Sequence, residues 1–342
     1  MSKYQLSFCI PTYKRCEFLI KNLYILISQI AQLEKQNFVE ICISDNASPD
    51  NTETEVKRII EDNPQINIRY SKHKENLGPD KNFINVMKMA SGEYSILWGD
   101  DDFLKDNGLS RIFYLIENNS TISFFLSSVT VNQRGLKIEK YFLREDIDTY
   151  KVDFSNEIET RAYCSLIQDM GALLSFISAV VYKTSIVTVD FDNRFIGTHY
   201  AFLFYWWNFL FDGNVLLYSK ESYLIETYQY QPAYGYGVKR IMIDYIGFTM
   251  VANTFIKNDR TKKDFLSSVN VTHSFIELRY IFISDPKGFV ELLEPKLVEC
   301  CVPLTEIQKL KESTSFKRIF ISLFVKLMHR RLIVFFKKLR RG

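Results

Sequence analysis

The chain has 342 residues, 47% of them apolar, so it is long enough to bury a large core. Its 43 basic and 40 acidic residues leave a net charge of +3, which gives no reason to expect nucleic acid as a partner. Six cysteines without a C-x-x-C pair fit neither a disulfide framework nor a zinc site, so we expect the cytosol. We also expect no secretion signal and no membrane-spanning helix, because no apolar run reaches roughly 20 residues.

Four short apolar runs in the first hundred residues alternate with segments of helical period. We predict strands at residues 6–10, 38–44, 66–71 and 94–98. The helix between the first two has apolar residues at spacings of three and four, and the next begins at Thr52 with the spacing of a capping box. With a third helix before the last strand, this order predicts a doubly wound, mostly parallel α/β sheet with helices on both faces. Ligands of such sheets bind outside the carboxyl ends of the strands.

Three adjacent carboxylates, Asp100, Asp101 and Asp102, follow the strand that ends at Trp98. Their mutual repulsion has to be offset. Mg²⁺ does this well, because it takes one or two protein carboxylates while substrate phosphates fill other positions. The alternative is a solvated turn before a helix that we expect to begin near Asp106.

Two other strand ends carry polar side chains. Asp45 closes the second strand, where it either caps the next helix or accepts hydrogen bonds from a nucleobase or ribose. Thr12, Tyr13 and Arg15 follow Pro11 at the end of the first strand. Backbone amides and a guanidinium can meet an anion or a base there, unless Pro11 merely ends the strand.

Taken together, four segments resemble the inverting glycosyltransferases of family 2, whose catalytic domain has the GT-A fold. The segments are CIPTYKR at 9–15, ICISDNASPDNT at 41–52, NLGPDKNF at 76–83 and ILWGDDDFL at 96–104. They occur in the family's order and at its usual spacing. Two more segments, GALLSFISAVVYK at 171–183 and FIGTHYAFLFYWW at 195–207, resemble the acceptor half of abequosyltransferase-like members, which build bacterial surface polysaccharides.

The resemblance implies roles for the residues at the predicted strand ends. Those that it places along the nucleotide pocket are Pro11, Thr12, Tyr13 and Arg15. It further implies that Asp45 meets the base and that Asp100 and Asp101 lie near the ribose and diphosphate. Asp102 would then be the ligand of a divalent metal, Mg²⁺ or Mn²⁺.

One position departs from the family pattern. Many relatives carry a Glu-Asp pair in the acceptor half whose Asp is the general base, whereas the matching stretch here is Gly197, Thr198 and His199. A neutral imidazole accepts a proton near pH 7, so His199 is the candidate base for the acceptor hydroxyl. The alternative is a histidine packed among aromatic side chains, with Asp192 and Asp190 as the fallback bases.

The resemblance also implies an organisation of the chain. We expect a nucleotide-sugar-binding half at 1–120, an acceptor-binding half at 121–240 and a C-terminal helical region at 241–342. Apolar and basic residues alternate within 316–341, which is typical of a helix on an anionic membrane surface. A helix packed on the core or on a protein partner is the alternative. The tyrosine-rich stretch 228–239 is either a lid over the donor or an ordinary aromatic loop.

These features predict a metal-dependent, inverting hexosyl- or deoxyhexosyltransferase that uses a nucleoside-diphosphate sugar. Its expected acceptor is a polyprenyl-linked glycan of O-antigen, capsule or lipooligosaccharide synthesis, at the inner face of the cytoplasmic membrane. One alternative is a non-catalytic protein of the same fold that binds lipid or protein, which the missing Glu-Asp pair keeps open. The other is a nucleotidyltransferase, although the usual glycine-rich phosphate loop is replaced by PTYKR.

Overall fold

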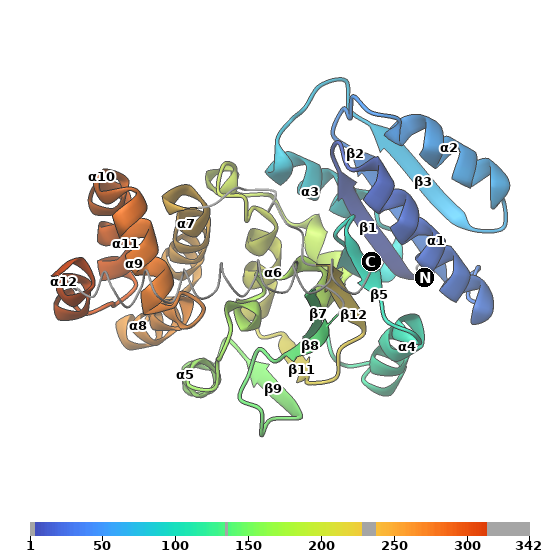
Figure 1. The fold of residues 1–342 in the computed structure, drawn as a ribbon. Helices are drawn as coiled ribbons and strands as arrows, with labels where there is room; N and C mark the ends of the chain where they lie inside the picture. Colours follow the sequence, from blue (N-terminus) through green and yellow to red (C-terminus); the bar gives the residue numbers. More distant parts are fainter. Residues whose placement is uncertain (1–3, 134–135, 228–236, 313–342) are drawn as a thin grey trace, which may run out of the picture.

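In this computed structural model, residues 4–133, 136–227 and 237–312 are described. They form a large sheet flanked by helices, a small second sheet and a group of helices near the C-terminus (Figure 1). The predicted α/β class is therefore confirmed. Residues 228–236 of the expected lid and the whole of the expected membrane segment lie outside the described ranges.

The first half of the large sheet consists of the four strands that the sequence predicts. They are β1 (Tyr4–Thr12), β2 (Val39–Asp45), β3 (Asn67–Lys72) and β4 (Gly92–Leu97). The connecting helices are α1 (Cys16–Gln32), α2 (Thr52–Asp62) and α3 (Pro79–Met89). These strands lie in the order β3-β2-β1-β4, and every neighbouring pair is parallel. Their carboxyl ends therefore meet at one edge of the sheet.

Helices pack against this half of the sheet through the predicted apolar faces. Helix α1 buries Leu19, Leu23, Leu26 and Ile30 and contacts α2 and α4 (Gly108–Asn118), whereas α3 contacts β1, β2 and α6 (Phe202–Phe211). Helix α2 begins at Thr52 as predicted. The prediction of a capping box is wrong, because Asn51 is the N-cap residue and its side chain makes no capping hydrogen bond. Instead, Asp50 Oδ1 accepts a hydrogen bond from Thr52 N at 3.2 Å.

The rest of the large sheet comes from the chain beyond residue 120. Its strands are β6 (Phe124–Ser127), β9 (Thr149–Asp153), β10 (Val180–Lys183) and β11 (Val215–Ser219). Strand β10 is antiparallel to both β4 and β6, β11 is parallel to β6, and β9 is antiparallel to β11. The complete order is β3-β2-β1-β4-β10-β6-β11-β9. Parallel pairs thus predominate only through the first half.

The sequence does not predict the second sheet. In spatial order its strands are β5 (Asp102–Leu104), β12 (Leu224–Thr227), β7 (Val129–Gln133) and β8 (Leu136–Lys140). They are three to five residues long, too short for a clear alternating pattern. Because β5 begins at Asp102, the last carboxylate of the acidic run is held by a strand.

The aromatic stretch of the second half is core. Along α6, Trp206 and Trp207 are fully buried, and the rings of Phe202 and Trp206 pack edge to face with centroids 4.8 Å apart. The neighbouring helix α5 (Glu157–Cys164) lies beside β9. Short 3₁₀ helices connect this part of the chain: η1 (Met170–Leu173), η2 (Ile177–Ala179), η3 (Thr184–Thr188) and η4 (Asn193–Phe195). These aromatic residues therefore stabilise the fold around the site.

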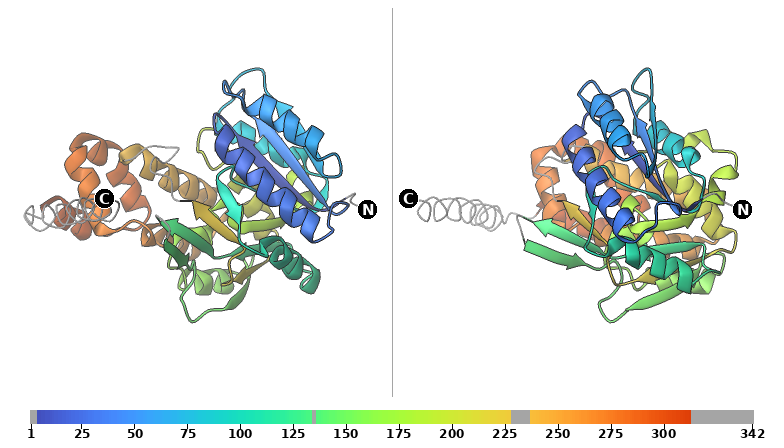
Figure 2. Two further views of the ribbon diagram at one scale, coloured as in Figure 1. Left: turned by 45° about the vertical axis from the view of Figure 1, so that its right-hand side comes forward. Right: turned by 90° about the vertical axis from the view of Figure 1, so that its right-hand side faces the viewer.

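Beyond residue 237 the described chain is helical, as predicted. The elements are α7 (Val238–Phe255), α8 (Asp259–Ser268), η5 (Val269–Val271), α9 (Phe275–Ser284), α10 (Pro286–Gly288), the π-helix η6 (Phe289–Leu293), α11 (Glu294–Glu299) and α12 (Leu304–Glu312). They form one end of the molecule, with α1 and α2 at the other (Figure 2). None of the helices in the described ranges has the length and apolarity that crossing a bilayer requires.

Candidate active site

The ends of β1 and β4 bring four predicted site residues into direct contact. Thr12 Oγ1 donates a hydrogen bond to Asp100 Oδ2 at 2.8 Å, and Arg15 Nη1 donates to Asp100 Oδ1 at 2.9 Å. The same guanidinium nitrogen lies 3.2 Å from Asp101 Oδ2. Burial raises the pKa of Asp100 to about 6, although Arg15 opposes the shift. Arg15 thus holds two adjacent carboxylates at the mouth of the parallel sheet.

Asp102 has a separate set of contacts. Its side chain is 7% exposed, and Ser178 Oγ of η2 donates a hydrogen bond to Asp102 Oδ2 at 2.6 Å. The same hydroxyl accepts from Gly99 N at 2.8 Å, which ties the acidic run to the second half of the sheet. A Cβ atom at Gly99 would lie 2.6 Å from Asp102 Oδ2, so any larger residue would have to displace this carboxylate. Ser178 lies inside segment 171–183, but nothing in the sequence marks its contact with Asp102.

Asp45 lies at the end of β2 and is fully buried. Ser48 N donates a hydrogen bond to its Oδ1 at 2.7 Å, and the Tyr70 hydroxyl donates to its Oδ2 at 2.6 Å. Burial and the neighbouring Asp45 raise the pKa of Tyr70, so the phenol stays protonated as a donor. Asp45 therefore orders the loop after β2, while its contact with a nucleobase stays a prediction. Tyr70 was not predicted, because a tyrosine in a strand gives no signal of its own.

The remaining residues of the predicted pocket differ in exposure. Pro11 is buried within β1, whereas the Tyr13 side chain is 42% exposed next to Thr12. Arg15 is the N-cap residue of α1, and its side chain retains 24% exposure. Of the four predicted pocket residues in this loop, Tyr13 and Arg15 are thus the two that a ligand can reach.

His199 lies in a turn that an acidic residue of the first half holds. Asp80, in the first turn of α3, accepts hydrogen bonds from the backbone N–H groups of Gly197 (2.7 Å), His199 (3.1 Å) and Ala201 (3.1 Å). His199 is half-buried and has a left-handed backbone conformation, with φ of 62°. Asp80 also lies inside a quoted segment, 76–83, yet its distant contact has no sequence signal.

The fallback bases lie in different surroundings. Asp192 accepts from Arg194 N at 2.9 Å and forms a 2.5 Å ion pair with the guanidinium of that residue. The hydrogen bonds from Arg194 lower the pKa of Asp192, which makes it a weaker base. Asp190 is exposed. Among the three candidate bases, His199 is thus the one whose backbone is hydrogen-bonded to a residue of the first half, Asp80.

The acidic run suits a metal that is bound together with a diphosphate. Within the described ranges, no cluster of three or more histidine, cysteine, aspartate or glutamate side chains could hold an ion alone. Asp100 and Asp101 nevertheless share the guanidinium of Arg15, and Asp102 follows them directly in the chain. Mg²⁺ commonly takes one or two protein carboxylates and completes its octahedron with phosphate oxygens and water. The donor set therefore fits such an ion.

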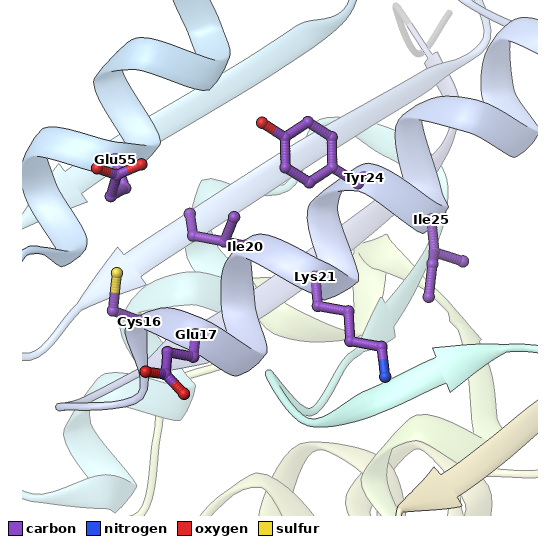
Figure 3. Close-up of a pocket in the computed structure, with 7 residues that line it drawn as sticks. All are labelled: Cys16, Glu17, Ile20, Lys21, Tyr24, Ile25 and Glu55. Carbon is purple, nitrogen blue, oxygen red and sulfur yellow. The ribbon is translucent and has the colours of Figure 1, made fainter.

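Two surface hollows of this structure lie away from these strand ends. One, of about 600 Å³, runs along α1 towards α2, as Figure 3 shows; its lining residues are Cys16, Glu17, Ile20, Lys21, Tyr24, Ile25 and Glu55. The other, of about 610 Å³, lies between α5 and α8 and includes Arg161 and Asp264. Neither hollow is lined by a predicted site residue, so the candidate site rests on the contacts at the strand ends.

Comparison with known proteins agrees with this architecture. Residues 7–169 match the family model described as Glycosyl transferase family 2. Abequosyltransferase RfbV of Salmonella typhimurium is 32% identical over 272 residues, which cover 76% of this chain and 78% of that protein. The GalNAc(5)-diNAcBac-PP-undecaprenol beta-1,3-glucosyltransferase of Campylobacter jejuni is 28% identical over 156 residues, 44% of this chain and 47% of that protein.

A solved structure shares the fold across nearly the whole chain. The mannosyltransferase PcManGT from Pyrobaculum calidifontis, in complex with GDP-Man and Mn²⁺, superimposes with a TM-score of 0.53. The match covers 94% of this chain and 86% of that one, at 12% sequence identity. This similarity concerns the fold.

Proposed function

We propose that this chain, which belongs to glycosyl transferase family 2 and is a glycosyltransferase, moves a sugar from a nucleoside-diphosphate sugar to a glycan acceptor with inversion at the anomeric carbon. The observation that carries the proposal is the contact of Arg15 and Thr12 with Asp100 where β1 and β4 end. In a parallel sheet this edge is where ligands bind. We therefore assign donor binding to the first half of the chain, residues 1–120.

In this proposal the donor lies along the β1 and β4 ends. Tyr13 is exposed enough to lie against the base, and Arg15 is placed to meet the diphosphate. Asp45 shapes the base pocket because it accepts hydrogen bonds from Ser48 N, in the loop after β2, and from the Tyr70 hydroxyl. Asp100 and Asp101 lie near ribose and diphosphate and keep Arg15 in place.

We assign Asp102 as the protein ligand of a divalent metal, Mg²⁺ or Mn²⁺. When bound, such an ion neutralises charge that grows on the departing nucleoside diphosphate. Ser178 and Gly99 keep the Asp102 carboxylate at the edge of the acidic run. Support comes from the three adjacent carboxylates, two of which contact the guanidinium of Arg15, and from the Mn²⁺ in the mannosyltransferase of the same fold.

On the acceptor side, His199 Nδ1 or Nε2 takes the proton from the attacking hydroxyl. The hydroxyl oxygen forms a bond to the anomeric carbon while the bond from that carbon to the diphosphate oxygen breaks. The nucleoside diphosphate leaves with the electron pair, and its negative charge is met by Arg15. A single displacement of this kind inverts the anomeric centre.

We further propose a lipid-linked acceptor in O-antigen, capsule or lipooligosaccharide synthesis, met at the inner face of the cytoplasmic membrane. Support for a sugar of the deoxyhexose kind is the similarity to an abequosyltransferase, and support for a polyprenyl acceptor is the similarity to the Campylobacter glucosyltransferase. The basic and apolar composition of 316–341 suits an anionic membrane surface.

The test is a thermal-shift series with UDP, GDP, CDP and dTDP, each with and without Mn²⁺. We expect one nucleotide to raise Tm by several degrees in the presence of Mn²⁺, because a ligand stabilises the state that binds it. Asp102→Asn should lose the Mn²⁺-dependent part of this shift. Asp106→Asn, which removes an exposed carboxylate four residues away, should keep it.

Two outcomes contradict parts of the proposal. If none of the four nucleotides stabilises the wild-type protein, the donor-site assignment is wrong and lipid binding becomes the first function to test. If one nucleotide stabilises Asp102→Asn as well as wild type, the metal assignment is wrong. Release of nucleoside diphosphate from the corresponding nucleotide sugar then separates an enzyme from a protein that only binds nucleotide.

A further inference from the structure

The first turn of α3 contains a carboxylate that serves a distant turn of the chain. Asp80 is 4% exposed, and both of its oxygens face backbone N–H groups from residues 197–201. Oδ2 accepts from Gly197 and His199, and Oδ1 accepts from Ala201. One side chain thus binds three amides that lie more than a hundred residues away in sequence.

The same helical turn is also tied to the donor-side strands. Asn82 Nδ2 donates to the backbone oxygens of Ser44 at 3.1 Å and Thr12 at 3.5 Å, and Ser44 Oγ donates to Asn82 Oδ1 at 2.7 Å. Thr12 in turn donates to Asp100. The start of α3 therefore contacts the ends of β1 and β2 through Asn82 and the turn containing His199 through Asp80.

The backbone of the 197–201 turn needs this support. Gly197 has φ of 91° and His199 has φ of 62°, both in the left-handed region. The left-handed backbone conformation destabilises a histidine by roughly 1–2 kcal/mol, and contacts with the surrounding structure have to offset this cost. A carboxylate has enough acceptor sites for all three amides, whereas an asparagine of the same shape would turn an N–H₂ group towards N–H donors. The turn at residues 197–201 therefore requires a carboxylate at position 80, and an amide cannot replace it.

We propose that Asp80 is a positioning residue, which fixes the turn containing His199 in register with the donor-side strand ends. This inference rests on the proposed function, in which His199 accepts the proton of the acceptor hydroxyl. Asp80 itself touches neither substrate in this scheme. It acts by placing the proton acceptor relative to the bound donor, and a small misplacement of a reacting group lowers the rate steeply.

The first test compares Asp80→Asn with the wild-type protein in transfer from the nucleotide sugar whose nucleotide stabilises the protein. We expect kcat to fall by about 10- to 100-fold while the KM for the donor changes less than about 2-fold. The matched control is Asp169→Asn, which removes another partly buried carboxylate that accepts from a backbone amide, Gly171 N at 2.8 Å. This control should leave kcat unchanged.

The second test measures the turn without any substrate. In hydrogen exchange, the peptide containing residues 197–201 should exchange faster in Asp80→Asn than in wild type, whereas peptides from β1 and β2 should not change. Unchanged exchange in that peptide, or a kcat equal to wild type, overturns the inference. If wild type transfers no sugar at all, the proposed function fails instead, and exchange still decides whether Asp80 holds the turn.

Discussion

Two buried carboxylates in different parts of the fold have their pKa values shifted in opposite directions. Asp100, where β1 and β4 end, is 4% exposed, and burial raises its pKa to about 6. Asp244, in α7, is 1% exposed. Burial acts on its pKa in the same direction, but pairing with His273 and Arg240 outweighs burial and lowers it.

The difference lies in how completely each charge is balanced. Asp244 Oδ1 accepts from Tyr200 at 2.7 Å and from Arg240 at 2.9 Å, and Oδ2 lies 3.3 Å from His273 Nε2. Asp100 shares the guanidinium of Arg15 with a second carboxylate, Asp101. The first cluster is complete within the protein, which suits a structural role. In the second, the ion pairs seen among the described residues set two carboxylates against one guanidinium, which suits a site that binds a cation and a ligand.

The largest expected effect concerns the balanced cluster. Burial alone would lower the pKa of His273, but Asp244 and Glu277 outweigh it and raise the pKa to about 9. A histidine with a raised pKa stabilises the fold fully below about pH 6.5, and this contribution is lost as pH rises through about 9. We expect His273→Gln to lower the free energy of unfolding by about 3 kcal/mol at pH 6.5, measured by urea denaturation.

The control for this variant is His73→Gln. His73 contacts Ser44 and Asn85 near β3 and has no carboxylate among these partners. The difference in unfolding free energy between wild type and His273→Gln should shrink between pH 7 and pH 10, and it should shrink by more than the difference between wild type and His73→Gln. A His273→Gln deficit that stays constant to pH 10 would show that the cluster is held by packing and not by charge.

The next effect concerns the unbalanced site. Arg15→Ala leaves Asp100 and Asp101 without the guanidinium that contacts both, so an anionic diphosphate meets uncompensated carboxylates. We expect the Kd for the stabilising nucleotide with Mn²⁺ to rise by about 100-fold in titration calorimetry. Arg58→Ala removes an exposed arginine that pairs with Glu55, and it should change the Kd by less than about 2-fold. Equal Kd values for the two variants would remove Arg15 from the donor pocket.

The sequence predicts the fold of the N-terminal half well, because its signals are local. Each strand is a short apolar run, each helix has one apolar stripe, and the polar residues follow the strands directly. Thr12, Arg15 and Asp100 meet because parallel strands place their carboxyl ends at one edge. Such a contact follows from the topology alone, so no knowledge of side-chain packing is needed.

The rest of the site depends on contacts between distant segments, which have no periodic signal. Asp80 binds amides 117 to 121 positions later, and Ser178 binds Asp102 from 76 positions away. The second sheet is missed because its strands are very short. That the aromatic stretch around Trp206 belongs to an acceptor-binding half stays a prediction, and its burial in the core is visible only in three dimensions.

The smallest expected effect concerns one of these distant contacts. Ser178→Ala removes the donor to Asp102 Oδ2 and the acceptor of Gly99 N while leaving every carboxylate of the acidic run in place. If Asp102 holds the metal, loss of a hydrogen bond to a ligand weakens metal binding by about 10-fold or more. We expect the Mn²⁺ concentration that half-saturates the nucleotide-induced thermal shift to rise by about 10-fold. Ser165→Ala, which removes an exposed hydroxyl bonded to Ala162 O, should leave it unchanged. If the half-saturating Mn²⁺ concentration is the same in both variants, Ser178 stabilises the chain after β4 but does not affect metal binding by Asp102. The assignment of Asp102 as the metal ligand would then depend only on the charge of Asp100, Asp101 and Asp102.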